Sequence, residues 1–232
     1  MARYGYGMSV SGTRKSIVSS SGEAPITTSR AFDSGGGQVG STNTGNIPAN
    51  WVANESTVTS VIFANDNSVT SIGSYAFGYC TGLTTITIPN SVTIIGSFAF
   101  YNCTSLTSAN IPTSVTSISE ATFKKCPSLA NITIPEGVTS IGSYAFYDCN
   151  ISTITIPSGV TSIGGYAFQS CNNLATVLCY VAQSAFVGEE AFSFASPLTI
   201  RVPTSGAVSD TWTAGTGLTF QGNTNVTVIK NL

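Results

Sequence analysis

Cysteine is the residue type with the most chemical potential in this chain, and its spacing is regular. Five of the six cysteines follow one another at intervals of 23, 23, 23 and 22 residues: Cys80, Cys103, Cys126, Cys149 and Cys171. The sequence has no close Cys-x-x-Cys pair of the kind that holds a metal. Framework disulfides are typical of small domains with little core and have irregular spacings. We therefore interpret the series as buried thiols that act as small hydrophobic side chains. The alternative is that successive cysteines of the series are joined by disulfides.

Other catalytic groups are scarce. The absence of histidine excludes Ser-His-Asp and Cys-His schemes and histidine-ligated zinc. Glu189-Glu190 is the one adjacent carboxylate pair, and neighbours in an extended segment point to opposite sides. A glycosidase would need two converging carboxylates. Asn65-Asp66-Asn67 could offer oxygen ligands to calcium, but a turn is the favoured interpretation. We predict no enzyme, no cofactor and no metal.

The residues around each cysteine also repeat. Copies begin at Val69, Val92, Val115, Val138 and Val160. A fixed period of this length predicts a solenoid, whose units bury their apolar faces by stacking. In most copies, Leu-x-x-Ile-x-Ile-Pro alternates as a strand that ends at the proline. Val-Thr-Ser-Ile predicts a second extended stretch, and Ala-Phe-x-x-Cys a short helical turn. We expect a β-rich α/β solenoid in which five phenylalanines form one column: Phe77, Phe100, Phe123, Phe146 and Phe168.

The segments outside the repeats differ in composition. Residues 1–50 are polar and rich in glycine, and we interpret them as an arm for anchoring or assembly. Within the arm, Arg3, Tyr4 and Tyr6 belong to a stretch whose alternation suits strand addition to a partner sheet. Residues 51–203 form the predicted solenoid, and residues 204–232 its C-terminal cap.

Composition limits the partners. Only 8% of residues are charged and the net charge is −2, which argues against nucleic acid. No run of 18 apolar residues predicts a membrane span. The first 20 residues hold no continuous apolar stretch of the kind found in export signals. We therefore favour a protein that does not use the general export route over one whose signal was removed.

The repeats resemble the BspA-like leucine-rich repeat family. The shared pattern is Ile-x-Ile-Pro-x-x-Val-Thr-x-Ile-Gly-x-x-Ala-Phe-x-x-Cys-x-x-Leu, seen from Leu83 through Leu174. The resemblance spans about residues 56–203. The third copy departs from it at Ser119, Ala121 and Thr122, one residue is missing in the turn after Cys149, and a degenerate sixth unit covers residues 187–203. It implies a surface or secreted protein of a bacterium or protist that binds host proteins or other cells. The opening of the arm resembles that of some tailed-phage virion proteins.

Two surfaces are candidate binding sites. The strand face carries the outward residues of the first extended stretch, among them Thr85, Thr87, Asn110, Thr133, Thr153 and Thr155. We interpret it either as a flat, uncharged surface that binds a protein or a glycan, or as threonines that are present only because they favour strands. The turn edge carries Tyr101, Lys124, Lys125 and Tyr147, near a row formed by Tyr75, Phe98, Tyr144 and Tyr166. Tyrosine beside a cation is a common composition for a binding hot spot, with packing and a solvated charge pair as the alternative.

Three non-catalytic functions stay open. The first is a phage virion-associated protein (decoration, fibre or tail) that is anchored by the arm and displays the repeats to a protein or a host surface. The second is a secreted or cell-surface adhesin of a bacterium or protist, as the family resemblance implies. The third is an ice-binding protein, because Thr-x-Thr rungs form a regular lattice. The predicted partners are proteins of a larger assembly (virion or surface layer), a host-surface protein or glycan, or a second copy of the chain. The predicted location is the virion, with the cell surface or secretion as the alternative.

Overall fold

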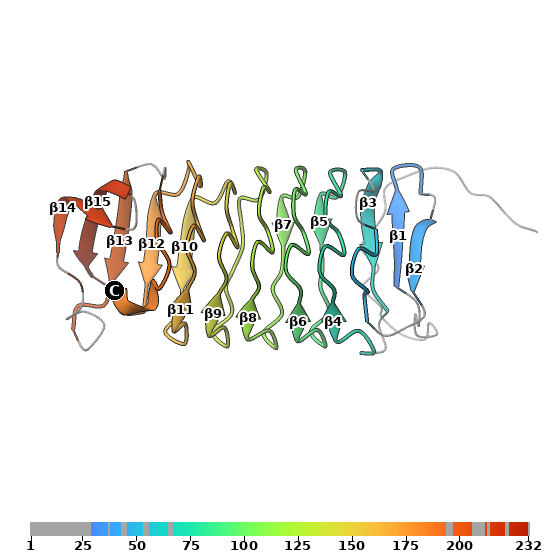
Figure 1. Cartoon of the computed structure of the whole chain (residues 1–232), viewed down its shortest axis with the longest axis horizontal. Helices are drawn as coiled ribbons and strands as arrows, with labels where there is room; N and C mark the ends of the chain where they lie inside the picture. The colour runs from blue at the N-terminus through green and yellow to red at the C-terminus, as the bar shows by residue number, and fades with distance from the viewer. Residues whose placement is uncertain are drawn as a thin grey trace, which may run out of the picture.

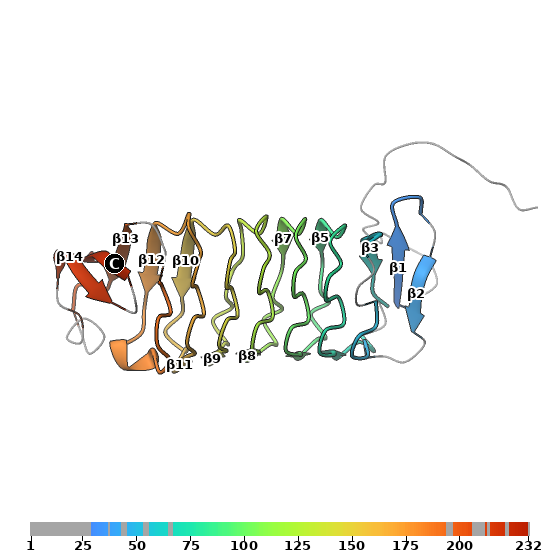
Figure 2. The same ribbon diagram turned by 45° about the horizontal axis from the view of Figure 1, so that its top comes forward.

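A computed structural model describes residues 29–36, 38–42, 46–52, 56–64, 67–193, 197–205, 212, 214–220 and 223–231. These residues form an elongated stack of coils that advances along one axis (Figures 1 and 2). Strands β1 (Ser29–Asp33) and β2 (Gln38–Thr42) lie at its N-terminal end, and β14 (Gly215–Phe220) and β15 (Asn223–Lys230) at its C-terminal end. The predicted assembly residues Arg3, Tyr4 and Tyr6 lie outside the described residues.

Successive coils pair in parallel along two sides of the stack. The first side consists of β5 (Thr85–Ile86), β7 (Ser108–Ala109), β10 (Thr153–Ile156), β12 (Thr176–Cys179) and β13 (Leu198–Val202). The second consists of β4 (Ser71–Ile72), β6 (Ile94–Ile95), β8 (Ser117–Ile118), β9 (Ser140–Ile141) and β11 (Ser162–Ile163). Each residue pairs with its equivalent one coil on, as Thr85 does with Ser108. Both extended stretches of the repeat are therefore confirmed, although most paired segments are only two residues long.

The third side of each coil, from the glycine to the cysteine, is a series of turns where a helical turn was predicted. Its backbone N–H groups donate alternately within the coil and to the next coil. Gly78 N–H donates to Tyr75 O at 2.9 Å, whereas Tyr79 N–H donates to Tyr101 O at 2.7 Å. Tyr75 and Tyr79 have positive φ angles of 54° and 63°, which a helix does not contain. Among the described residues, the 3₁₀ helix η1 (Gln183–Ala185) is the one helical element. The solenoid is confirmed, but the α/β label fits it only loosely.

Strands from outside the clear repeats close both ends of the stack. At the N-terminal end, β3 (Val58–Ile62) pairs antiparallel with β1, which pairs antiparallel with β2. At the other end, β15 pairs in parallel with β13, and β14 is antiparallel to β15. Residues 29–50, which the sequence placed in the arm, contribute the buried side chains of Ala31 and Ile47 to the core.

One apolar interior runs through all the coils. The predicted column of phenylalanine rings is present, with Phe192 of the degenerate sixth unit continuing it. Neighbouring ring centres are 5.2 to 5.7 Å apart and the rings are nearly parallel. All five predicted phenylalanines have 0% exposure. Because each ring packs on the ring of the next coil, the stacking couples adjacent coils.

The cysteine series lies beside this column. All six cysteines are buried and none forms a disulfide, as the hydrophobic interpretation predicts. Each thiol of the series also donates a hydrogen bond to a backbone carbonyl of the preceding coil; the Cys103 Sγ, for example, lies 3.1 Å from Phe77 O, and the Cys126 Sγ lies 3.2 Å from Phe100 O. Burial raises the pKa of Cys126 to about 12, so this thiol stays protonated at neutral pH. The thiols therefore act as packing groups and as donors between coils.

Candidate binding surfaces

The strand face is formed by the outward residues of β5, β7, β10 and β12 and of the segments that continue them. The predicted residues Thr85, Thr87, Asn110, Thr133 and Thr153 are exposed, and Thr155 is half-buried. Parallel pairing places equivalent residues in rows, for instance Thr153 beside Thr176. The alternation of the sequence thus identified which side chains face outward. The rows present hydroxyl and amide groups without charge over the length of the repeats.

Asn110 has a structural role on this face. Its Nδ2 donates to Ile88 O at 2.9 Å, and its Oδ1 accepts a hydrogen bond from Ile88 N–H at 2.7 Å. The side-chain amide therefore pairs with the neighbouring coil as a backbone amide would, just beyond the paired residues of β5 and β7. Both polar groups of Asn110 are engaged between coils, so this residue is less available to a ligand than the threonines around it.

The turn edge is formed by nine residues: Tyr75, Tyr79, Phe98, Tyr101, Lys124, Lys125, Tyr144, Tyr147 and Tyr166. The Tyr75 and Phe98 rings stack with their centres 4.7 Å apart. Tyr101 packs edge-on against Tyr79 at 5.0 Å and against Phe98 at 5.9 Å. Tyr101 therefore lies at the centre of an aromatic cluster, while Tyr79 is 39% exposed at its margin. Because the stacked rings cover one another's faces, they offer ring edges and hydroxyl groups to a partner.

The third copy interrupts the row of stacked aromatic rings. Ala121 stands where the copies on both sides have an aromatic residue. The Lys124 ammonium group lies 4.0 Å from the centre of the Tyr144 ring and 5.1 Å from that of Tyr147. A cation above an aromatic ring is attracted by the negative ring face. Lys124 is thus held against the rings of the fourth copy, and the turn edge continues across the interruption as a contact between lysine and tyrosine.

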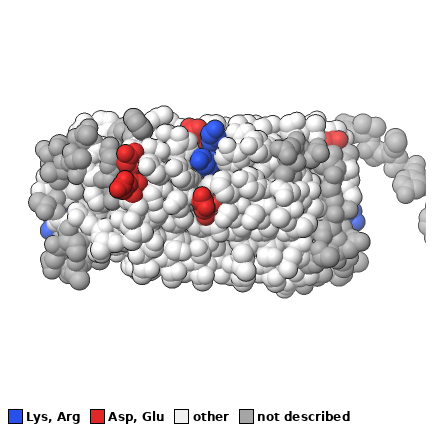
Figure 3. Space-filling view, viewed as in Figure 1, with Lys and Arg blue, Asp and Glu red and all other residues white. Residues whose placement is uncertain are grey.

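Charge on this side of the molecule is concentrated in a few places. Figure 3 shows a small blue group with red groups near it, while most of the described surface in that view is white. The predicted residue Lys125 is exposed, whereas Lys124 is partly buried by its ring contacts. At the far end of the turn edge, the negative charge of Glu190 raises the pKa of Tyr166. A partner would therefore meet a mostly uncharged surface with one local cationic site.

Sequence reasoning did not single out a third exposed surface, on the second side of the stack. It consists of the threonines that follow the first valine of each copy: Thr70, Thr93, Thr116, Thr139 and Thr161. The Thr139 hydroxyl donates to Thr116 O at 3.1 Å, and Thr161 to Thr139 O at 3.2 Å. Ile94, also on this side, is 62% exposed. The recurrence of Val-Thr in every copy is the signal that could have found this row.

Within the part of the chain that the structure describes, no group of three histidine, cysteine or acidic residues could hold a metal ion. No helix among the same residues is long and apolar enough to cross a bilayer.

The sequence of residues 45–175 matches the model of the BspA type leucine rich repeat region, in six copies. The chain belongs to this family. None of the curated proteins matches the chain. A leucine-rich repeat protein from Bacteroides ovatus is 40% identical with a TM-score of 0.54, over 59% of this chain and 36% of its own. The chain thus spans about a third of the length of that protein.

Two further solved structures are similar. A leucine rich cell surface protein from Faecalibacterium prausnitzii is 36% identical, with a TM-score of 0.48, over 56% of this chain and 34% of its own. The T. pallidum leucine rich repeat protein is 26% identical, with a TM-score of 0.53, over 69% of this chain and 73% of its own. Neither the Bacteroides ovatus protein nor the T. pallidum protein is described as a virion component. The comparisons therefore give no support to the virion interpretation, and family membership favours the alternative of a cell-surface or secreted protein.

Proposed function

We propose that this chain is a non-catalytic adhesion module, exposed at a cell surface or secreted, that binds a protein partner through the turn edge. The contact of Lys124 with the two tyrosines of the fourth copy carries this proposal. Membership in the BspA type family supports the surface location and the binding role. The same membership supports the absence of catalysis.

The turn edge fits a protein partner better than the strand face does. Tyrosine, together with a cation that is already in place, has the composition of a binding hot spot, because rigid rings bury large areas at a small loss of side-chain entropy. The strand face offers mainly short hydroxyl side chains, and one of its amides, Asn110, is engaged with the neighbouring coil. Contacts centred on Tyr101 and Lys124 would span the second to fourth copies.

Binding of the fluorescently labelled chain to intact epithelial and bacterial cells tests this function. Protease treatment of the cells should abolish binding, because the proposed partner is a protein. The double variant Tyr101→Ala, Lys124→Ala should lower the affinity at least about tenfold, the effect of losing about 1.4 kcal/mol. Tyr180→Ala is the matched control, since Tyr180 is 37% exposed and lies outside the turn edge. Equal binding by the double variant and the control would contradict the turn edge as the binding surface.

A further inference from the structure

The fourth copy is one residue shorter than the others at a single corner of the coil. Four copies place two residues between the cysteine and the next buried leucine: Thr81-Gly82, Thr104-Ser105, Pro127-Ser128 and Asn172-Asn173. In those copies the leucine N–H donates back to the cysteine carbonyl at 2.9 to 3.1 Å, which closes a β-turn. In the fourth copy only Asn150 joins Cys149 to Ile151. This linker is too short for the same four-residue turn, so the corner lacks the bulk that its neighbours have.

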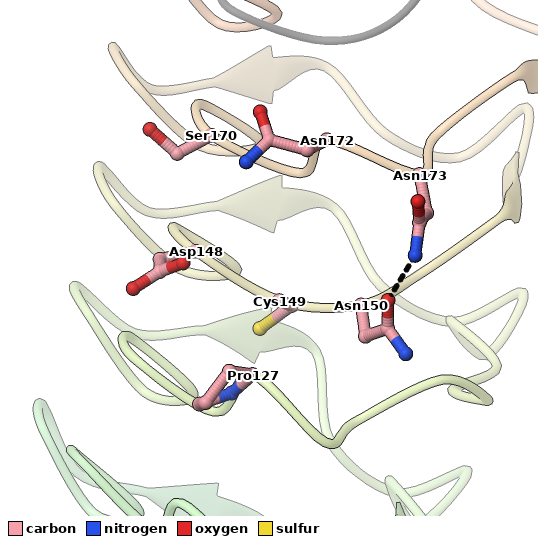
Figure 4. A pocket seen from close by; sticks show the side chains of 7 residues that line it. All are labelled: Pro127, Asp148, Cys149, Asn150, Ser170, Asn172 and Asn173. Carbon is pink, nitrogen blue, oxygen red and sulfur yellow. Dashed lines mark hydrogen bonds between the residues drawn. The ribbon is translucent and has the colours of Figure 1, made fainter.

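A shallow hollow of about 230 Å³ lies at this corner (Figure 4). It is lined by Pro127 of the third copy, by Asp148, Cys149 and Asn150 of the fourth, and by Ser170, Asn172 and Asn173 of the fifth. Figure 4 shows Asp148 and Ser170 on one side, Asn150 and Asn173 on the other, and Cys149 between them. The hollow has room for several water molecules. That space suits one sugar ring and is too small for a folded partner.

The polar groups around the hollow are arranged as donors and acceptors. Asn173 Nδ2 donates to Asn150 Oδ1, which orients both amides. The Nδ2 of Asn150 then remains as a donor and the Oδ1 of Asn173 as an acceptor. Asp148 adds a carboxylate acceptor, and Ser170 a hydroxyl that can both donate and accept. Asp148 and Ser170 hold equivalent positions in the fourth and fifth copies. Their φ angles are both positive, 58° and 60°, so the two residues share one backbone conformation in adjacent coils.

The chemistry of this lining selects among ligand classes. The Asp148 carboxylate repels an anion, and polar walls give an apolar ligand little to bury. A calcium ion takes six to eight oxygen ligands, usually with several carboxylates, whereas this lining has one carboxylate. A neutral ligand with adjacent hydroxyl groups can donate to the carboxylate and pair with the amides. We propose that the hollow binds a single sugar unit of a glycan. The lining shares no residue with the turn edge, and the proposal does not depend on the function proposed for that surface.

Nuclear magnetic resonance titration of the whole chain with four probes tests this site: the methyl glycosides of glucose, galactose, mannose and N-acetylglucosamine. At least one should shift the side-chain amide signals of Asn150, Asn172 and Asn173, with a dissociation constant of about 1 to 10 mM. Asp148→Asn should weaken that binding at least about tenfold. Insertion of one serine between Asn150 and Ile151 restores the two-residue linker and should abolish the shifts, while the melting temperature reports whether the fold is kept.

Matched controls separate this proposal from others. Asn102 holds the position in the second copy that Asp148 holds in the fourth, with a φ angle of 57°. The change Asn102→Asp is the reverse of Asp148→Asn and should leave sugar binding unchanged. The double variant Tyr101→Ala, Lys124→Ala should also leave it unchanged, so the two proposals can fail independently. The sugar site is overturned if no probe shifts these amides at about 50 mM. It is equally overturned if Asp148→Asn binds as the parent does, or if glycerol at the same concentration produces the same shifts.

Discussion

Replacement of Phe123 by alanine tests the stacked interior most directly. The ring is fully buried in the middle of the column, 5.2 Å from Phe100 and 5.7 Å from Phe146 between ring centres. A Phe→Ala change in a core costs about 3 to 5 kcal/mol through lost burial and the cavity left behind. Each aromatic pair adds about 0.5 to 1.5 kcal/mol beyond its buried area. Since Phe123 belongs to two such pairs, we expect the upper part of the first range, about 4 to 5 kcal/mol.

Denaturant and thermal unfolding measure this loss at both ends of the solenoid. The two tryptophans lie far apart in the stack: Trp51 packs edge-on against Phe77 at 5.7 Å, and Trp212 is buried near Phe186 at 6.2 Å. The variants Trp51→Phe and Trp212→Phe therefore each leave one fluorescent reporter. In the parent, the two signals should change together. With Phe123→Ala both midpoints should fall, by about 8 to 20 °C for a chain of this size, and the two reporters should separate because the coupling between halves is weakened.

Val187→Ala is the control, since Val187 is 67% exposed and its change should stay within about 0.5 kcal/mol. A loss below about 1 kcal/mol for Phe123→Ala, with the two tryptophan signals still coincident, would refute the idea that successive coils share one interior.

Two other changes probe the same core. Ile134→Asp places a charge at a buried strand position with 3% exposure, and without a partner it should prevent folding or lower the unfolding free energy by several kcal/mol; circular dichroism and urea unfolding measure this, and a parent-like midpoint would show that Ile134 does not face the core. The pH dependence of stability tests the buried thiols. Burial raises the pKa of Cys126 from 9.0 to about 12, so as the pH rises this thiol ionises in the unfolded chain before it ionises in the folded one. The contribution of the protonated Cys126 thiol to the free energy of unfolding should be complete below pH 9 and should be lost as the pH rises toward 12. The urea midpoint should fall over that window, less steeply in Cys126→Ala, and an equal slope in the variant would contradict the raised pKa.

The core was predictable because each buried position recurs in every copy. Phe123 and Cys126 repeat at one period with the same neighbours, and strand alternation places Ile134 inside. The conformation between the glycine and the cysteine of each copy was not predictable. Phe and Cys three residues apart face the same side in a helix and in a series of turns. Hydrogen bonds to the next coil decide between them, as Phe123 N–H shows by donating to Ala145 O at 2.9 Å. Local sequence does not reveal that partner.

The candidate sites also combine features that the sequence predicts with features that depend on contacts between coils. Alternation identified the outward rows of threonine, but the engagement of Asn110 with Ile88 depends on a rotamer that crosses between coils. The contact of Lys124 with Tyr144 likewise needs both the alanine at position 121 and the distance between coils. The deletion after Cys149 is visible in the sequence, where it reads as a tolerated change in a turn. Only the spatial arrangement of three successive copies shows that it leaves a hollow.

Among the five clear copies, the departures that change the surface lie in the third and fourth. The third copy carries Ala121 and the pair Lys124-Lys125, and the fourth has the short linker at Asn150. The buried phenylalanine and cysteine are unchanged in both copies, so these departures alter the surface and leave the core intact. In a solenoid each coil contacts only its neighbours, and a local change in one coil therefore remodels one patch without disturbing the rest. The contact of Lys124 with tyrosine on the turn edge and the polar hollow follow from this property: the repetitive interior supplies stability, and a few irregular positions in adjacent coils form the two surfaces for which we propose binding.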